Sequence, residues 1–113
     1  MRIEAPNYSV EYNEETHRVS FSGTLRLQGR SEYQEIYSLL MAAAEGSEGP
    51  VVLDIKELRY LNSSGISSLS LFIVQMRKRV KPVKIIGNSN MSWQAKSIRN
   101  FERLHPQVEL VLQ

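Results

Sequence analysis

Two segments near the start of the chain alternate between apolar and polar residues. They read "NYSVEYN" at residues 7–13 and "HRVSFSGTL" at residues 17–25, and the polar stretch "NEET" joins them. Alternation over this length is typical of a β-strand with one buried face, and a short polar connection predicts an antiparallel hairpin. We expect this to be the only hairpin in the molecule.

From Ser31 onward the apolar residues take the three-and-four spacing of amphipathic helices. The spacing predicts a first helix over residues 31–44, a largely buried second helix whose apolar stripe runs from Ile66 to Val80, and a third helix over residues 92–104. Ser31 and Gln34 have the Ser-x-x-Gln spacing of a capping box, so we expect the first helix to begin there.

Short apolar runs separate these helices. "VVLDI" at residues 51–55 has the pattern of a central strand covered on both faces, and "PVKIIG" at residues 82–87 and "VELVL" at residues 108–112 predict two further strands. The order β-β-α-β-α-β-α-β predicts one α/β domain over residues 1–113. Its sheet is expected to be mixed and five-stranded, mostly parallel with one antiparallel edge strand, and with the helices packed on it.

Three connections should meet at the carboxyl edge of this sheet, where α/β proteins place their sites. They are residues 25–31, 61–65 and 87–92. Because each follows a strand and leads into a helix, they are the first places to search for functional side chains.

Composition narrows the class of protein. Of the 113 residues, 42% are hydrophobic and 23% charged, which is typical of a folded globular domain. Cysteine is absent, so disulfides and thiolate metal sites are excluded. No signal-type apolar segment or membrane-length apolar run is present, and we expect a soluble, cytoplasmic protein that does not bind a membrane.

The charge pattern does not favour nucleic-acid binding. The formal net charge is only +2, and the one basic cluster is "MRKRVK" at residues 76–81. Cations in the last turn of a helix stabilise it through the helix dipole, which accounts for this cluster without a nucleic acid.

The stretch "LNSSGISSL" at residues 61–69 places polar residues between an apolar strand and an apolar helix. Asn62, Ser63 or Ser64 can cap the helix by accepting a hydrogen bond from a backbone N–H group two or three residues further on. The same helix end stabilises negative charge, so a serine there can also carry a phosphate without disrupting the fold. Spacing alone leaves both interpretations open.

The order of elements and the segment "VVLDIKELRYLNSSGISSLSLFIVQMRKR" resemble the STAS domain of bacterial anti-sigma factor antagonists. The resemblance in topology spans nearly the whole chain, but it is specific only over residues 51–80. In that family a strand ending in an aspartate precedes an Asp-Ser-(Ser or Thr)-Gly-hydrophobic motif at the start of a helix. Here Asp54 takes the place of the strand aspartate.

The resemblance implies a function controlled by phosphorylation. It places Ser63 at the serine that an anti-sigma-type serine kinase phosphorylates and a serine phosphatase resets, with Ser64 as the second choice. Gly65 and Ile66 complete the motif. Asn62 departs from it, because antagonists usually have aspartate at this position. Asparagine can cap the helix equally well, but it removes a carboxylate beside the acceptor hydroxyl, so a constitutively unphosphorylated variant is also an open interpretation.

Other side chains are candidates for the same surface. Arg26 and Arg30 lie in the connection expected beside the motif, where they can face a phosphate or simply be solvated. Met91 and Trp93 open the third helix, either as half-buried packing or as part of a partner-binding patch.

The sequence offers little for catalysis. No acidic partner at ligand spacing accompanies His17 or His105, so we expect no metal site and no catalytic triad. Glycine-rich phosphate loops are also absent, and we expect no cofactor and no enzymatic activity.

We therefore expect a regulatory protein that exchanges binding partners, as anti-sigma factor antagonists do in transcription regulation and signal transduction. Two other functions remain open: a non-phosphorylated scaffold subunit of a signalling assembly, and a domain that binds a nucleotide or a lipid headgroup. Oligomeric state is not predicted.

Overall fold

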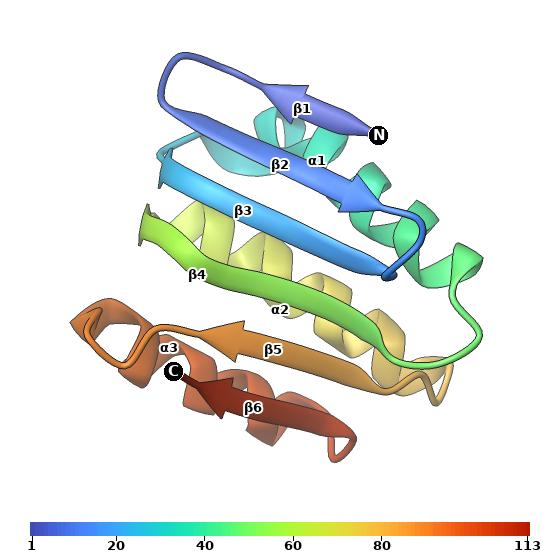
Figure 1. The fold of residues 1–113 in the computed structure, drawn as a ribbon. Coiled ribbons are helices and arrows are strands. Elements are labelled where there is room, and N and C mark those ends of the chain that lie inside the picture. Colours follow the sequence, from blue (N-terminus) through green and yellow to red (C-terminus); the bar gives the residue numbers. More distant parts are fainter.

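Six strands form one mixed sheet in the order β1-β2-β3-β4-β5-β6, so every strand lies beside its neighbours in sequence. The computed structural model describes residues 1–113 (Figure 1). Strands β3 to β6 are parallel, and β1 and β2 pair antiparallel with each other and with β3. The strands are β1 (Arg2–Glu4), β2 (Tyr8–Asn13), β3 (Arg18–Leu25), β4 (Val51–Leu61), β5 (Val83–Gly87) and β6 (Val108–Leu112).

All three helices pack on the same side of this sheet (Figure 1). They are α1 (Gly29–Gly46), α2 (Ser63–Lys78) and α3 (Ser92–Leu104). The predicted covering of residues 51–55 on both faces is therefore wrong. Along β4, Val51, Leu53 and Ile55 face the helices and are buried, while Val52 is half-buried on the other face. None of the helices combines the length and apolarity needed to cross a membrane.

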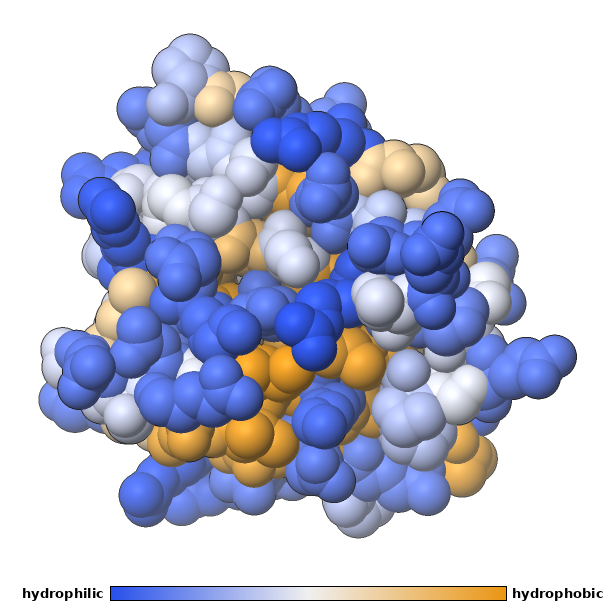
Figure 2. Space-filling model, in the orientation of Figure 1, coloured by the Kyte–Doolittle hydropathy of each residue, from blue (hydrophilic) through white to orange (hydrophobic).

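The side of the sheet without helices is called the open face below. It carries mostly short polar and charged side chains, including Ser9 and Ser22, whose hydroxyls are 2.6 Å apart. Figure 2 shows this face as mainly hydrophilic, with hydrophobic side chains gathered in the lower half of the view, over β5 and β6. The hydrophobic core lies on the opposite side, between the sheet and the helices.

The sheet has one strand more than predicted. Strand β1 pairs with β2 through Arg2–Glu11, Ile3–Val10 and Glu4–Ser9, which forms a second hairpin. The antiparallel strand β2 is therefore interior, and β1 is the edge. A three-residue strand is too short for alternation to reveal it, which explains why the pattern did not predict it.

The capping-box prediction for α1 is also wrong. The helix begins at Gly29 after Gln28, and Ser31 lies exposed in its first turn. Glu32 Oε1 accepts a hydrogen bond of 2.8 Å from the Gln28 N–H, so this carboxylate satisfies the free backbone donor instead. An acidic side chain in the first turn is also favoured by the helix dipole.

Strand β4 extends six residues beyond the predicted end at Ile55. Its pairing with β5 stops at Asp54 opposite Ile86, but its pairing with β3 continues to Leu61 opposite Leu25. The register against β3 shifts twice, because β4 has an extra residue between positions 54 and 57 and another between 58 and 60. Such bulges bend a strand and redirect its side chains.

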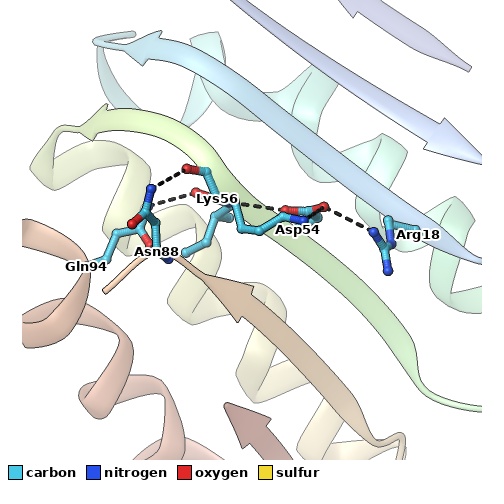
Figure 3. A network of polar contacts seen from close by, with 6 residues as sticks. Arg18, Asp54, Lys56, Asn88 and Gln94 are labelled. Carbon is cyan, nitrogen blue, oxygen red and sulfur yellow. Dashed lines mark hydrogen bonds and ion pairs between the residues drawn. The ribbon is translucent and has the colours of Figure 1, made fainter. Parts of the chain in front are cut away.

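Beyond the last β4–β5 pair, side chains that follow β5 in sequence form hydrogen bonds with the β4 backbone. The fully buried Gln94 donates from Nε2 to the carbonyl oxygens of Ile55 at 2.7 Å and Leu58 at 3.1 Å. Asn88 Nδ2 donates to the Lys56 carbonyl at 3.3 Å, and Gln94 Oε1 accepts from the Asn88 N–H at 2.7 Å (Figure 3). These bonds replace the missing strand ladder.

Candidate functional site

Ser63 is the first residue of α2 and lies at the carboxyl edge of the sheet. Its side chain is exposed, and no hydrogen bond within the chain engages its hydroxyl. The free N–H groups of the first helical turn and the positive end of the helix dipole surround this position.

The Asn62 side chain caps α2 and forms hydrogen bonds with three partners. Its Oδ1 accepts from the Gly65 N–H at 3.0 Å and from the Tyr33 hydroxyl at 2.6 Å. Its Nδ2 donates to the Leu27 carbonyl at 2.7 Å, and its own N–H donates to the Leu25 carbonyl. One side chain therefore joins the end of β3, helix α1 and the start of α2.

These contacts give a physical reason for asparagine in place of aspartate. An aspartate retains the two acceptor interactions but has no Nδ2 donor, and its second oxygen would face the Leu27 carbonyl at hydrogen-bond distance. Two oxygens without a shared proton repel each other. The aspartate that the motif leads one to expect would therefore destabilise this arrangement.

Gly65 is required by close packing beneath the cap. A Cβ atom at this position would collide with the Leu61 side chain and lie 2.7 Å from the Tyr33 hydroxyl oxygen. Burial raises the pKa of Tyr33 to about 12, so its hydroxyl stays protonated and keeps donating to Asn62. The glycine of the motif therefore makes room for this tyrosine.

Ser64 differs from Ser63 in its surroundings. It is half-buried, and its Oγ accepts a hydrogen bond of 3.2 Å from the Gly29 N–H at the start of α1. The second-choice phosphoacceptor is thus engaged in joining two helix ends. Ile66 is half-buried and packs against the core.

Arg26 and Arg30 lie on either side of Leu27 in sequence, the residue whose carbonyl accepts from Asn62 Nδ2. Arg26 is exposed, with its guanidinium carbon 4.7 Å above the centre of the Tyr60 ring. Arg30 is exposed in the first turn of α1, one residue after Gly29. The connections 25–31 and 61–65 therefore meet as expected.

The third connection, residues 87–92, contacts β4 further from the α2 start. Trp93 is half-buried and donates from Nε1 to the Leu58 carbonyl at 3.2 Å, and Met91 Sδ lies 3.4 Å from Gln94 Nε2. No hydrogen bond joins either residue to Asn62 or Ser63. Trp93 therefore supports the bulged part of β4, and Met91 contacts Gln94, which binds the same part of the strand.

Asp54 is not at the end of its strand and not at the α2 start. It lies in the middle of β4 on the open face, 3.2 Å from Arg18 Nη1 and 3.6 Å from Lys56 Nζ (Figure 3). No three His, Asp or Glu side chains anywhere in the structure are grouped so as to hold a metal ion.

The residues that sequence reasoning missed at this site are Leu27, Tyr33 and Tyr60. Leu27 acts through its backbone carbonyl, which no side-chain pattern reveals. Tyr33 was assigned to the helix core by its spacing, and this is also correct, since the side chain is only 2% exposed. Its hydroxyl becomes informative only when Asn62 is known to lie beside it.

No protein-family model matches this sequence, and no curated protein matches it. Solved structures match its fold along its full length. Apo-SiaC from Pseudomonas aeruginosa has a TM-score of 0.72 at 15% identity, covering 100% of this chain and 98% of that one. A second structure, of SiaC from Pseudomonas aeruginosa, has a TM-score of 0.76 at 16% identity, covering 100% of this chain and 96% of that one.

A third match comes from the crystal structure of the diguanylate cyclase SiaD in complex with its activator SiaC, also from Pseudomonas aeruginosa. Its TM-score is 0.76 at 14% identity, and the match covers 100% of this chain and 99% of that one. At these identities the likeness shows a shared fold. The chain thus shares the fold of SiaC along its full length.

Proposed function

We propose that this protein is a regulatory protein-binding switch whose state is set by reversible phosphorylation of Ser63. The observation that carries the proposal is the contrast between the three polar residues at the α2 start. Asn62 and Ser64 are engaged in bonds that hold the site together, whereas the Ser63 hydroxyl is exposed and unengaged. A kinase can therefore modify Ser63 without breaking an internal contact.

The position of Ser63 also favours the phosphorylated form of this residue. A phosphoserine carries a charge of about −1.5 to −2, and the N-terminus of a helix stabilises such a charge through its N–H groups and dipole. We expect the fold to tolerate the modification and the surface to change its charge sharply. A partner that binds the unmodified surface would then be released by repulsion and by the energy required to desolvate the phosphate.

The proposed partner-binding surface includes the outer stripe of α2. Ser63, Ser67 and Leu71 follow one another at intervals of four residues and are all exposed, so they lie on one helix face. Leu71 is an unusually exposed apolar side chain on this helix, at 38%, and it borders a narrow cavity of about 110 Å³ between α1 and α2 that Arg30 also lines. An apolar contact beside a charge-sensitive serine is suited to a reversible interface.

The structural neighbours suggest what kind of partner to test first. One of them is the activator of a diguanylate cyclase, so we propose a signalling enzyme of this class as the target, with catalysis belonging to the partner. An anti-sigma-type serine kinase and a serine phosphatase would set the phosphorylation state. The resemblance to anti-sigma factor antagonists implies an alternative output of the same switch, the control of a sigma factor.

The phosphorylation step can be tested by intact-mass measurement. The protein is incubated with ATP and a serine kinase encoded beside its gene, and the expected result is one phosphate adduct. The adduct should be lost in Ser63→Ala and retained in the matched control Ser64→Ala. An adduct that persists in Ser63→Ala, or no adduct with any such kinase, would favour the non-phosphorylated scaffold instead.

The partner step is tested separately with a diguanylate cyclase from the same genome. Unmodified protein should raise the rate of cyclase turnover, and Ser63-phosphorylated protein should not. The control is Leu71→Glu, which keeps Ser63 but places a charge on the same stripe, and it should also fail to activate. Equal activation by all three forms would contradict the proposed surface.

A further inference from the structure

A second cavity at the carboxyl edge of the sheet lies outside the α2 start. Its volume is about 550 Å³, within the size range of small-molecule sites. The β1–β2 turn, the end of β3 and the last part of β4 form its walls, and none of its lining residues is acidic. Arg26 and Arg59 are the two charged residues among those that line it.

Arg59 lines this cavity and is also the extra residue of the second β4 bulge. Gly23 pairs with Leu58 and Thr24 with Tyr60, so Arg59 is the extra residue without a partner on β3. Bulges of this kind often redirect side chains next to functional sites. The side chain is exposed and forms no ion pair.

Arg26 has an aromatic neighbour that orients its side chain. Its guanidinium lies over the Tyr60 ring at 4.7 Å from the centre, which limits its rotamers. It too forms no ion pair with a carboxylate. A pre-positioned charged group loses less conformational entropy on binding than a free one.

The opposite wall is rigid. The Asn7 carbonyl accepts a hydrogen bond of 2.8 Å from the Thr24 N–H, and a Cβ atom at Gly23 would collide with that carbonyl. Gly23 also has φ of +89°, which favours glycine. The turn therefore lies tightly against β3 and brings the polar side chains of Asn7 and Thr24 to the cavity that the two arginines line.

From this arrangement we propose that the cavity binds the phosphate groups of a small ligand, either a nucleotide or an inorganic polyphosphate. Arginine binds phosphate oxygens through paired N–H donors, and two unpaired guanidinium groups without a nearby carboxylate select for an anion of more than one charge. Leu27 links this cavity to the α2 start, because it lines the cavity and its carbonyl accepts from Asn62. The cavity and the α2 cap are therefore both in contact with the connection between β3 and α1.

The test uses ATP and inorganic tripolyphosphate as probes, in titration calorimetry at low salt with no kinase present. We expect at least one probe to bind, and binding to weaken at least about tenfold in Arg26→Ala and in Arg59→Ala. Arg77→Ala, an exposed arginine in the last turn of α2, is the matched control and should change affinity less than about twofold. Binding of both probes identifies the phosphates alone as the ligand, and binding of ATP only identifies a nucleotide.

Amide chemical shifts provide a readout that does not depend on the variants. With either probe, the shifts of Thr24, Arg26 and Leu27 should move in the wild-type protein. Ser63→Ala should keep the binding while losing phosphorylation, which separates this site from the proposed switch. No binding of either probe, equal binding in the arginine variants, or shifts confined to other residues would overturn the proposal.

Discussion

Asn62 is the residue whose contacts most clearly exceed its capping role. Asn62→Asp retains the cap on Gly65 but loses the Nδ2 bond to the Leu27 carbonyl. A part-buried carbonyl left without its donor destabilises a fold by about 1–3 kcal/mol, so we expect the free energy of unfolding to fall by that amount. Urea denaturation measures the change.

The control for this prediction is the neighbouring residue. Ser63→Ala removes an exposed, unengaged hydroxyl and should change the unfolding free energy by less than about 0.5 kcal/mol. Asn62→Asp with wild-type stability would mean that the Leu27 contact contributes nothing. Asn62→Asp also tests whether this fold accommodates the aspartate that anti-sigma factor antagonists usually have at this position.

Tyr33 makes the stability of the cap depend on alkaline pH. Burial raises its pKa in the folded protein to about 12, above the ordinary value of about 10. The folded state therefore holds the phenolic proton more tightly than the unfolded state, and this stabilisation is complete below about pH 10 and is lost as pH rises through 12.

Comparison with Tyr33→Phe isolates this effect from the titration of lysines, which both proteins share. The variant lacks the hydroxyl, so the difference in unfolding free energy between wild type and variant should shrink from about pH 9 to about pH 12. Absorbance of the ionised phenol should show one tyrosine titrating late in the wild type only. A pH-independent difference would contradict the burial of this hydroxyl.

For single residues, the sequence predicts which residues lie at the site better than it predicts which contacts they make. The motif correctly placed a capping asparagine and an exposed Ser63 at the start of α2. The bonds of Asn62 to Leu27 and Tyr33 cross 35 and 29 positions of sequence, so no local pattern contains them. Whether Ser63 is phosphorylated stays a prediction.

Among the elements, β4 depends on a side chain from a helix. Gln94→Ala would take away the partner that Gln94 gives to the Ile55 carbonyl and to the Asn88 N–H, and it would leave the Leu58 carbonyl with the Trp93 Nε1 donor alone. Loss of a buried hydrogen-bond network of this size should lower the unfolding free energy by about 2–4 kcal/mol. Chemical denaturation and hydrogen exchange along residues 55–61 measure the effect.

The matched control for Gln94 is Lys96→Ala, an exposed residue two positions along the same helix. It should change the stability by less than about 0.5 kcal/mol. If Gln94→Ala is equally mild, water or a rearranged side chain must satisfy the Ile55 carbonyl and the Asn88 N–H, and Gln94 would not be what holds the bulged strand.

The same strand explains which elements the sequence predicted poorly. Periodicity correctly indicated all three helices and five of the six strands, because those segments are long or strongly apolar. It ended β4 at Ile55, since "KELRYL" alternates irregularly across two bulges. The nearly all-apolar run "VVLDI" also predicted that helices cover both faces of β4. On the open face, however, Asp54 is buried by Arg18 and Lys56, which belong to the sheet itself.

For the whole molecule, the one-sided arrangement separates two regions. The helices cover one face of the sheet and bring the switch candidate to the carboxyl edge, while the open face carries the ion pairs around Asp54 (Figure 3). A sheet with one solvated face must keep polar groups there, and each charge on it needs a partner or water. Stability on the open face and regulation at the edge should therefore respond to different substitutions.

Asp54→Asn tests this separation. It removes the charge that faces Arg18 and Lys56 but keeps an oxygen able to accept from the Lys56 N–H, which Asp54 Oδ1 now does at 3.1 Å. Because the arginine is partly exposed and screened by solvent, the loss should be about 1 kcal/mol of unfolding free energy. The rate of Ser63 phosphorylation by the same kinase should stay within about twofold of wild type, since Asp54 lies mid-strand on the open face. A large drop in that rate at unchanged stability would place Asp54 inside the kinase-binding surface and join the two regions into one.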